Sequence, residues 1–219
     1  RSMNCGSGTF SYNNCNGDAI TLDRANISPN TYIFVDDYFI GCIAQVDGSC
    51  NVQPSVPVFC GDVNLSEPTP GQGYSYGDVT FTRVVGASAA GYTDLQAERV
   101  NWAMSNGPNL GYSDWDINSA IWNLLDNTNY TTCNGLCVAA EAAVPSVVGG
   151  IAEQMVFFIP DNGSVQPFVE NKSYTTSSFC TLTVQARGSC GGEQIDVRVN
   201  DVTVATYTLT TSYVNYNFD

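Results

Sequence analysis

The segment that decides the fold is Pro57-Val58-Phe59-Cys60-Gly61-Asp62-Val63. Residues 56–63 are predicted to form a strand, and Cys60 lies near its end. Cys60 needs an explanation because the other eight of the nine cysteines form short-range pairs in the sequence. An odd cysteine is either a reactive thiol or a buried residue that packs like a small apolar one.

Each of the four expected cysteine pairs spans a segment with turn residues, which can bring two thiols within bonding range. The pairs are Cys5–Cys15, Cys42–Cys50, Cys133–Cys137 and Cys180–Cys190. Spacing does not fix connectivity, but this cysteine usage favours an oxidising compartment. We therefore expect a disulfide-stapled extracellular or cell-surface protein. Five sequons are candidate glycosylation sites, at Asn26, Asn64, Asn129, Asn162 and Asn171.

Composition excludes several functional classes. The 219 residues include 7 Lys+Arg and 21 Asp+Glu, for a net charge of -14, which argues against binding nucleic acid or anionic membranes. Histidine is absent, so Ser-His-Asp and Cys-His catalytic pairs and histidine metal sites are excluded. The carboxylates include no recognisable glycosidase pair, and we expect no enzyme. The most apolar stretch, residues 138–159, is interrupted by charged residues and proline, so no membrane insertion is expected.

The pattern of the chain predicts a mainly β protein with a small helical insertion, built from disulfide-stapled sandwich-like or barrel-like domains. Three regions are expected: an N-terminal β region at 1–55, a β domain with the helical insertion at 56–170, and a C-terminal β region at 171–219. Strands are predicted at 31–35, 38–44, 56–63, 78–85, 153–159, 180–186, 193–199, 202–210 and 213–218.

Three helices are expected inside the second region. Asp94 is placed as the cap of the first, which runs to Met104 and is stopped by Gly107 and Pro108. Ser113 and Asp116 resemble a capping box that opens the second helix. Its apolar residues follow helical spacing at Ile117, Ala120, Ile121, Leu124 and Leu125. The third helix is expected over 136–144.

The order of the motifs after Cys60 carries a resemblance. The helix contains Asp116-Ile117-Asn118-Ser119-Ala120-Ile121-Trp122, and the chain then reads Met155-Val156-Phe157-Phe158-Ile159-Pro160 and Val165-Gln166-Pro167-Phe168. This ordered set resembles the thioester domains of bacterial surface adhesins, including relatives in matrix proteins of Gram-negative bacteria. The resemblance covers residues 56–170, about half the chain. It implies an aromatic-Cys strand, a helical insertion, and a closing strand that ends in a proline-containing loop.

In that family a Cys thiol condenses with a Gln carboxamide, releases ammonia and leaves a buried thioester open to attack by amines on a host surface. Cys60 matches the family cysteine, but Asn118 stands where the family has Gln. Asn is one methylene shorter, so a bond would need the two backbones about 1.5 Å closer, which a packed interior resists. The sequence therefore favours a buried thiol at Cys60, with a Cys60–Asn118 cross-link as the alternative.

A second resemblance covers residues 180–210. Ala186-Arg187-Gly188, Gly191-Gly192-Glu193 and Val204-Ala205-Thr206-Tyr207-Thr208-Leu209 resemble the first half of calcium-dependent xylan-binding modules. Tyr207 stands where Trp is common in that family. The resemblance implies Ca²⁺ as a possible cofactor, with Glu193 and Asp196 as candidate ligands; a solvated turn and strand face is the other interpretation.

Four strands without a second sheet would leave an apolar face and unpaired edges. Either residues 1–55 cover them, or a strand from another copy completes the sheet. We therefore expect a homo-polymer, the structural subunit of an extracellular filament or surface layer, assembled through residues 1–4 and the strand at 213–218. The alternative is a monomeric adhesive or carbohydrate-binding module for surface glycans. Tyr207, Tyr213 and Tyr216 would then be sugar platforms, with cross-strand packing as their other interpretation.

Overall fold

The computed structural model describes residues 4–36, 40–68, 73–126, 132–176, 182–199 and 202–218. The chain divides into two compact units, Arg1–Thr176 and Ser177–Asp219. Strands account for 30% of the residues and helices for 23%, so the predicted mainly β class is confirmed. Within the described residues, no helix has the length and apolar character needed to cross a bilayer.

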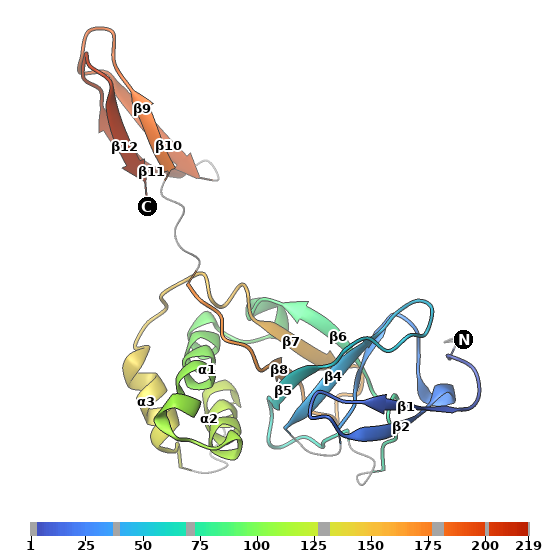
Figure 1. The fold of residues 1–219 in the computed structure, drawn as a ribbon. Coiled ribbons are helices and arrows are strands. Elements are labelled where there is room, and N and C mark those ends of the chain that lie inside the picture. The colour runs from blue at the N-terminus through green and yellow to red at the C-terminus, as the bar shows by residue number, and fades with distance from the viewer. Residues whose placement is uncertain are drawn as a thin grey trace. The chain divides into compact units, whose positions relative to one another are not determined.

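A closed barrel forms the centre of the first unit (Figure 1). Its strands follow the order β3 (Thr31–Phe34), β4 (Gly41–Val46), β5 (Val56–Cys60), β8 (Phe168–Glu170), β7 (Val156–Pro160) and β6 (Thr80–Val85), and β6 closes onto β3. Neighbouring strands are antiparallel throughout. Aromatic rings fill the interior, where Phe34 stacks on Phe168 with 4.8 Å between centroids and Phe81 meets the same ring edge-on.

The barrel removes the domain boundary that the sequence suggested after residue 55. Strands β3 and β4 come from the first 55 residues, yet they close the same sheet as β5 to β8. The division between 1–55 and 56–170 is therefore wrong. The prediction placed a boundary there because Pro54 and Pro57 are typical of a linker, but residues 56 and 57 are already the first two residues of β5.

A hairpin of β1 (Thr9–Asn13) and β2 (Ala19–Asp23) packs beside the barrel through Leu22, which is fully buried with Ile33, Val35 and Ala44. Two disulfides tie this hairpin and the loop before it to the barrel. They join Cys5 to Cys50 and Cys15 to Cys42.

The predicted pairs Cys5–Cys15 and Cys42–Cys50 are therefore wrong. Strand β1 lies between Cys5 and Cys15, and five extended residues separate its ends by about 17 Å, which a disulfide cannot span. Cys42 lies within β4 and Cys50 beyond the turn that follows it. Both therefore meet a cysteine from the N-terminal segment instead of each other.

Three helices cover one side of the barrel (Figure 1). They are α1 (Asp94–Asn106), α2 (Asp114–Asp126) and α3 (Gly135–Ala143), with single helical turns at Arg24–Asn26, Ser88–Ala90 and Pro108–Leu110. Their apolar faces share a buried cluster with Phe59, Phe157 and Val169 from the barrel wall. This contact fixes α2 against the end of β5.

The helix starts differ in one detail from expectation. Thr93, not Asp94, is the N-cap of α1, because Thr93 Oγ1 accepts from the Gln96 N–H while the Gln96 side chain accepts from the Thr93 N–H. At α2 the expected reciprocal pair is present: Asp116 accepts from Ser113 N–H at 3.0 Å, and Ser113 Oγ accepts from Asp116 N–H at 3.2 Å.

The second unit consists of two antiparallel strand pairs. Strand β9 (Leu182–Ala186) pairs with β12 (Val214–Phe218), and β10 (Gln194–Val199) pairs with β11 (Val202–Thr208). Tyr207 and Tyr216 bring the two pairs together, with ring centroids 5.2 Å apart. Each described strand of this unit therefore has one partner strand and one open edge.

Candidate functional site

The barrel and the helices bring Cys60 and Asn118 into contact. Cys60 is the last residue of β5, opposite Phe168 on β8, and Asn118 lies in the second turn of α2. Both residues are fully buried. The Cys60 backbone N–H donates to Asn118 Oδ1 at 2.9 Å, although the two residues are 58 positions apart in the sequence. The shorter Asn side chain thus reaches the end of the cysteine strand.

The other end of the Asn118 carboxamide is not satisfied. Asn118 Nδ2 is buried and has no acceptor among the described residues. A buried donor without a partner costs about 1–3 kcal/mol. The buried amide nitrogen of Asn118 is therefore an unfavourable group at this position.

The environment of Cys60 holds its sulfur as a thiol. Burial raises the pKa of Cys60 well above its ordinary value, and the nearby Glu67 carboxylate raises that pKa further. A thiol is a weak nucleophile, so any reaction of Cys60 requires a group that removes the proton.

Sequence reasoning did not find Glu67. The residue follows Ser66, which forms a bridge with Val165, and it precedes the buried Pro68. Glu67 is half-buried, and burial raises its pKa to about 7 from an ordinary 4.5. Nothing in the sequence marks this carboxylate, because it becomes relevant only when the loop after β5 folds back towards Cys60.

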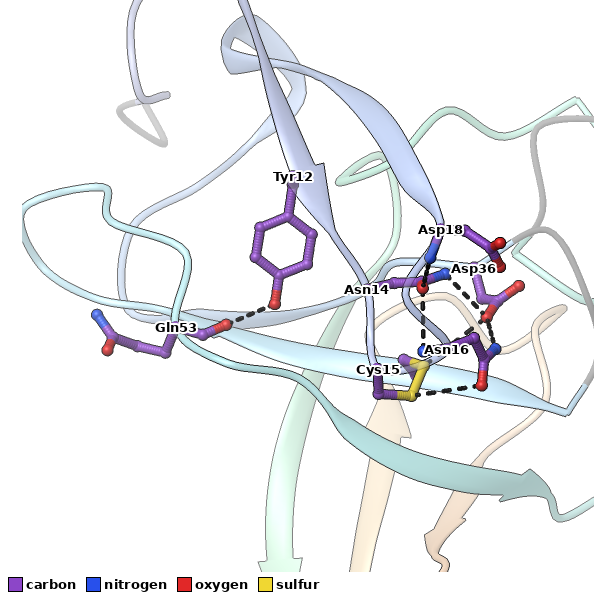
Figure 2. Close-up of a disulfide and its surroundings, with 8 residues drawn as sticks. Tyr12, Asn14, Cys15, Asn16, Asp18, Asp36 and Gln53 are labelled. Atoms are coloured by element: carbon purple, nitrogen blue, oxygen red, sulfur yellow. Dashed lines mark hydrogen bonds between the residues drawn. A yellow bond between two sulfur atoms is a disulfide. The ribbon is translucent and has the colours of Figure 1, made fainter.

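A second buried polar cluster, also missed from the sequence, surrounds the Cys15–Cys42 disulfide (Figure 2). Asp36 is fully buried, and its Oδ2 accepts from Asn14 Nδ2 at 3.2 Å and from Asn16 Nδ2 at 2.5 Å. The carboxylate thus fixes the loop after β1 beside the disulfide. Because these amides are directed at Asp36, the cluster acts as a structural anchor.

The candidate calcium ligands do not form one site. Glu193 Oε1 accepts from Ser189 N–H at 2.9 Å and from Cys190 N–H at 3.0 Å, so this carboxylate closes a turn. Asp196 instead accepts from Thr206 Oγ1 at 2.7 Å on an exposed face. The group of acidic and thiol side chains that meets metal-site spacing in the described residues is Cys133, Cys137 and Glu141, and its two sulfurs already form a disulfide.

The other candidate residues have varied surroundings. Asn64, Asn162 and Asn171 are exposed, Asn26 is half-buried, and Asn129 lies outside the described residues. Cys180 is also outside them, so its pairing with Cys190 stays a prediction. The remaining proposed sugar platform, Tyr213, is 60% exposed and lies under the Arg187 guanidinium. Tyr207 on β11 and Tyr216 on β12 meet edge-on between the two strand pairs, which differs from the cross-strand packing within one sheet that the sequence offered as their other interpretation.

Comparison with known proteins gives matches to solved structures alone. No family model and no curated protein matches the chain. The N-terminal thioester domain of a Clostridium perfringens surface protein matches with 17% identity and a TM-score of 0.44, over 65% of this chain and 98% of that one. The N-terminal thioester domain of the Streptococcus pyogenes fibronectin-binding protein SfbI matches with 13% identity and a TM-score of 0.44, over 66% and 94%.

The N-terminal domain of the S. pyogenes pilus tip adhesin Cpa also matches, with 10% identity and a TM-score of 0.41, over 67% of this chain and 95% of that one. These values do not assign the chain to a family. The resemblance of residues 180–210 to xylan-binding modules has no counterpart among these structures and stays a prediction.

Proposed function

We propose that the chain is an extracellular surface protein and that its barrel-and-helix unit is an adhesive domain, with Cys60 and Asn118 as its reactive pair. The observation that carries the proposal is the buried hydrogen bond of 2.9 Å between Cys60 N–H and Asn118 Oδ1. Three disulfides in the described residues support an oxidising location.

The proposed chemistry conserves all atoms. The Cys60 Sγ–H bond and the Asn118 Cγ–Nδ2 bond break, an Sγ–Cγ bond forms, and ammonia leaves with the thiol proton. The loss also removes the unsatisfied Nδ2 donor from the interior. Later attack by a surface amine on Cγ would form an amide and return the Cys60 thiol, leaving the domain covalently attached.

Burial suits this chemistry in a second way. Cys60 and Asn118 are both 0% exposed, so water has little access to the acyl group. An amine must therefore reach Cγ through a local opening of the domain. This requirement would favour amines presented by a bound partner over those free in solution.

Intact mass of the unmodified chain tests the proposal. The chain is deglycosylated and reduced with a phosphine, because a thiol reductant would exchange with the thioester. The expected result is a deficit of about 17 Da, one ammonia, that is absent from Cys60→Ala and from Asn118→Ala. A full-mass chain, in which Cys60 is alkylated once the protein is unfolded, would overturn the covalent mechanism.

A second function is favoured by a separate observation. In the second unit Ile195, Val197, Ala205 and Tyr207 lie on one face of the β10–β11 pair and are only half-buried, and each described strand has an open edge. A β-strand from another copy of the chain would cover these residues and pair with an edge. Such head-to-tail contacts build filaments, so we infer a homo-polymer as the assembled form.

Electron microscopy of native material tests the assembly. Fibres of constant width are expected from the full chain, and removal of residues 1–4, which lie mostly outside the described residues, or of 213–219 should abolish them. Dispersed particles from the full chain, or unimpaired fibres from both truncations, would overturn the filament proposal.

A further inference from the structure

We propose that Glu67 carries the proton from the Cys60 thiol to the departing ammonia when the cross-link forms; this inference rests on the function proposed above. The role needs a titratable group held beside the reacting pair. Neither partner can supply it, because Cys60 starts as a thiol and the Asn118 carboxamide is not a base at neutral pH.

The geometry of the loop after β5 places Glu67 at the end of the barrel where Cys60 lies. Gly61 N–H donates to Pro167 O at 2.8 Å, directly beyond the Cys60–Phe168 pair. Further along, Ser66 N–H donates to Ser164 O and Ser66 O accepts from Gln166 N–H, both at 3.0 Å. The loop is therefore bound at both ends to the segment that leads into β8.

Glu67 extends from this fixed loop. Ser66, immediately before it, is bridged to Val165, and Val165 belongs to the same buried cluster as Cys60. Burial raises the pKa of the Cys60 thiol, and the charge of the Glu67 carboxylate raises that pKa further; among the described residues, Glu67 is the charged group that does so. The strand and helix packed against Cys60 contribute the uncharged Phe168, Asn118 and Trp122.

One carboxylate is enough to carry out both proton transfers of the reaction. Glu67 takes the Sγ–H proton as the sulfur attacks Asn118 Cγ, and the resulting carboxylic acid then protonates Nδ2 as the Cγ–Nδ2 bond breaks. Ammonia departs and Glu67 returns to the carboxylate, so no external acid or base is consumed. A group with a pKa of about 7 can perform both transfers near neutral pH.

The composition of the chain leaves few alternatives for this role. Histidine, the usual carrier at neutral pH, is absent from all 219 residues. The carboxylate of Asp116, on the same helix as Asn118, is engaged at the exposed start of α2 by Ser113. Asp62, two residues after Cys60, accepts from Asn64 N–H at 2.8 Å, and Glu67 is the carboxylate whose charge acts on Cys60.

Time-resolved intact mass of newly synthesised full-length chain tests the inference. Ammonia loss is followed at pH 6, 7 and 8 in the unmodified chain, in Glu67→Gln, in Glu67→Asp and in Glu153→Gln. Glu153 is an exposed carboxylate before β7 and serves as the matched control. Circular dichroism and thermal unfolding establish that each variant is folded.

Glu67→Gln should slow ammonia loss about 100-fold and remove its dependence on pH. Glu67→Asp should recover part of the rate, because it restores a carboxylate, and Glu153→Gln should match the unmodified chain. Ammonia loss at the same rate and with the same pH profile in Glu67→Gln would overturn this inference alone. Absence of ammonia loss from the unmodified chain would overturn the proposed function, and this inference with it.

Discussion

The side-chain carboxamide of Asn101 forms two hydrogen bonds with the backbone of Tyr174, which lies 73 residues later in the sequence. Asn101 Oδ1 accepts from the Tyr174 backbone N–H at 2.8 Å, and Asn101 Nδ2 donates to the Tyr174 backbone O at 2.9 Å. Both residues are buried. One side chain on α1 thus replaces a strand partner for the segment that follows β8, and it holds the helical layer to the barrel.

Asn101→Ala should lower the free energy of unfolding by about 2–4 kcal/mol, because two buried backbone groups of Tyr174 lose their partner. Urea unfolding measures the change. Asn123→Ala is the control, since Asn123 Nδ2 donates to Ser119 O within its own helix. Equal losses in the two variants would contradict the tethering role of Asn101.

Asp36→Ala should destabilise the first unit by about 1–3 kcal/mol, because the buried amide of Asn14 would lose its acceptor, while the exposed amide of Asn16 can turn to water. Calorimetry with the disulfides intact measures this loss. Asp18→Ala removes an exposed carboxylate from the same loop and should change stability little. A small effect from Asp36→Ala would show that water replaces the carboxylate.

Glu67 should make stability depend on pH near neutrality. Its pKa is raised to about 7 in the folded state from an ordinary 4.5. Folding therefore favours the protonated acid, whose contribution is complete below about pH 4.5 and is lost as the pH rises through 7. Relative to the unmodified chain, Glu67→Gln should gain stability between pH 4.5 and 8 in urea unfolding. Parallel curves for the two proteins would contradict this assignment.

In the second unit, Glu193 should make stability fall as the pH is lowered, which is the opposite of the effect of Glu67. Backbone hydrogen bonds, that from Cys190 first, lower the pKa of Glu193 to about 2. The stabilising contribution is present above an ordinary pKa of 4.5 and is lost as the pH falls towards 2. Tyrosine signals of the second unit, followed by NMR during acid titration, should report the loss.

Glu193→Gln should reduce the size of that acid transition. Asp196→Asn should leave the transition unchanged, because the Asp196 carboxylate accepts from Thr206 Oγ1 and closes no turn. A transition that is unchanged in Glu193→Gln would assign the acid sensitivity to another group.

Local patterns predicted most of the elements of this fold. The periodicity around Ile117 and Leu124 predicted α2, and the alternation near Val197 and Tyr207 predicted β10 and β11. The short strand β8 was missed because three residues, Phe168–Glu170, carry too little pattern. The sequence predicted barrel-like or sandwich-like domains but not which strands close the barrel, because the pairing of distant strands is decided by packing and not by local sequence.

The candidate site was predicted in part. The motif order indicated Cys60 and Asn118. Only the three-dimensional structure shows that Asn118 Oδ1 accepts a hydrogen bond from the Cys60 backbone N–H. Glu67 and Asp36 are acids in unremarkable surroundings along the chain, and their roles come from burial next to distant groups. The predicted pair Cys133–Cys137 is confirmed, whereas Cys5–Cys15 and Cys42–Cys50 are wrong, because the hairpin and β4 bring these four cysteines together in the other combination.

The nesting of the Cys15–Cys42 bond inside the Cys5–Cys50 bond has a mechanical consequence. Tension applied between the two ends of the chain passes from Cys5 to Cys50 through sulfur and bypasses the intervening backbone. The disulfide thus prevents the segment between these cysteines, which are 45 residues apart, from extending, and this segment has a contour length of about 150 Å. Strands β3 and β4 lie between Cys5 and Cys50, so these two strands of the barrel wall would stay unextended when the molecule is pulled from its ends.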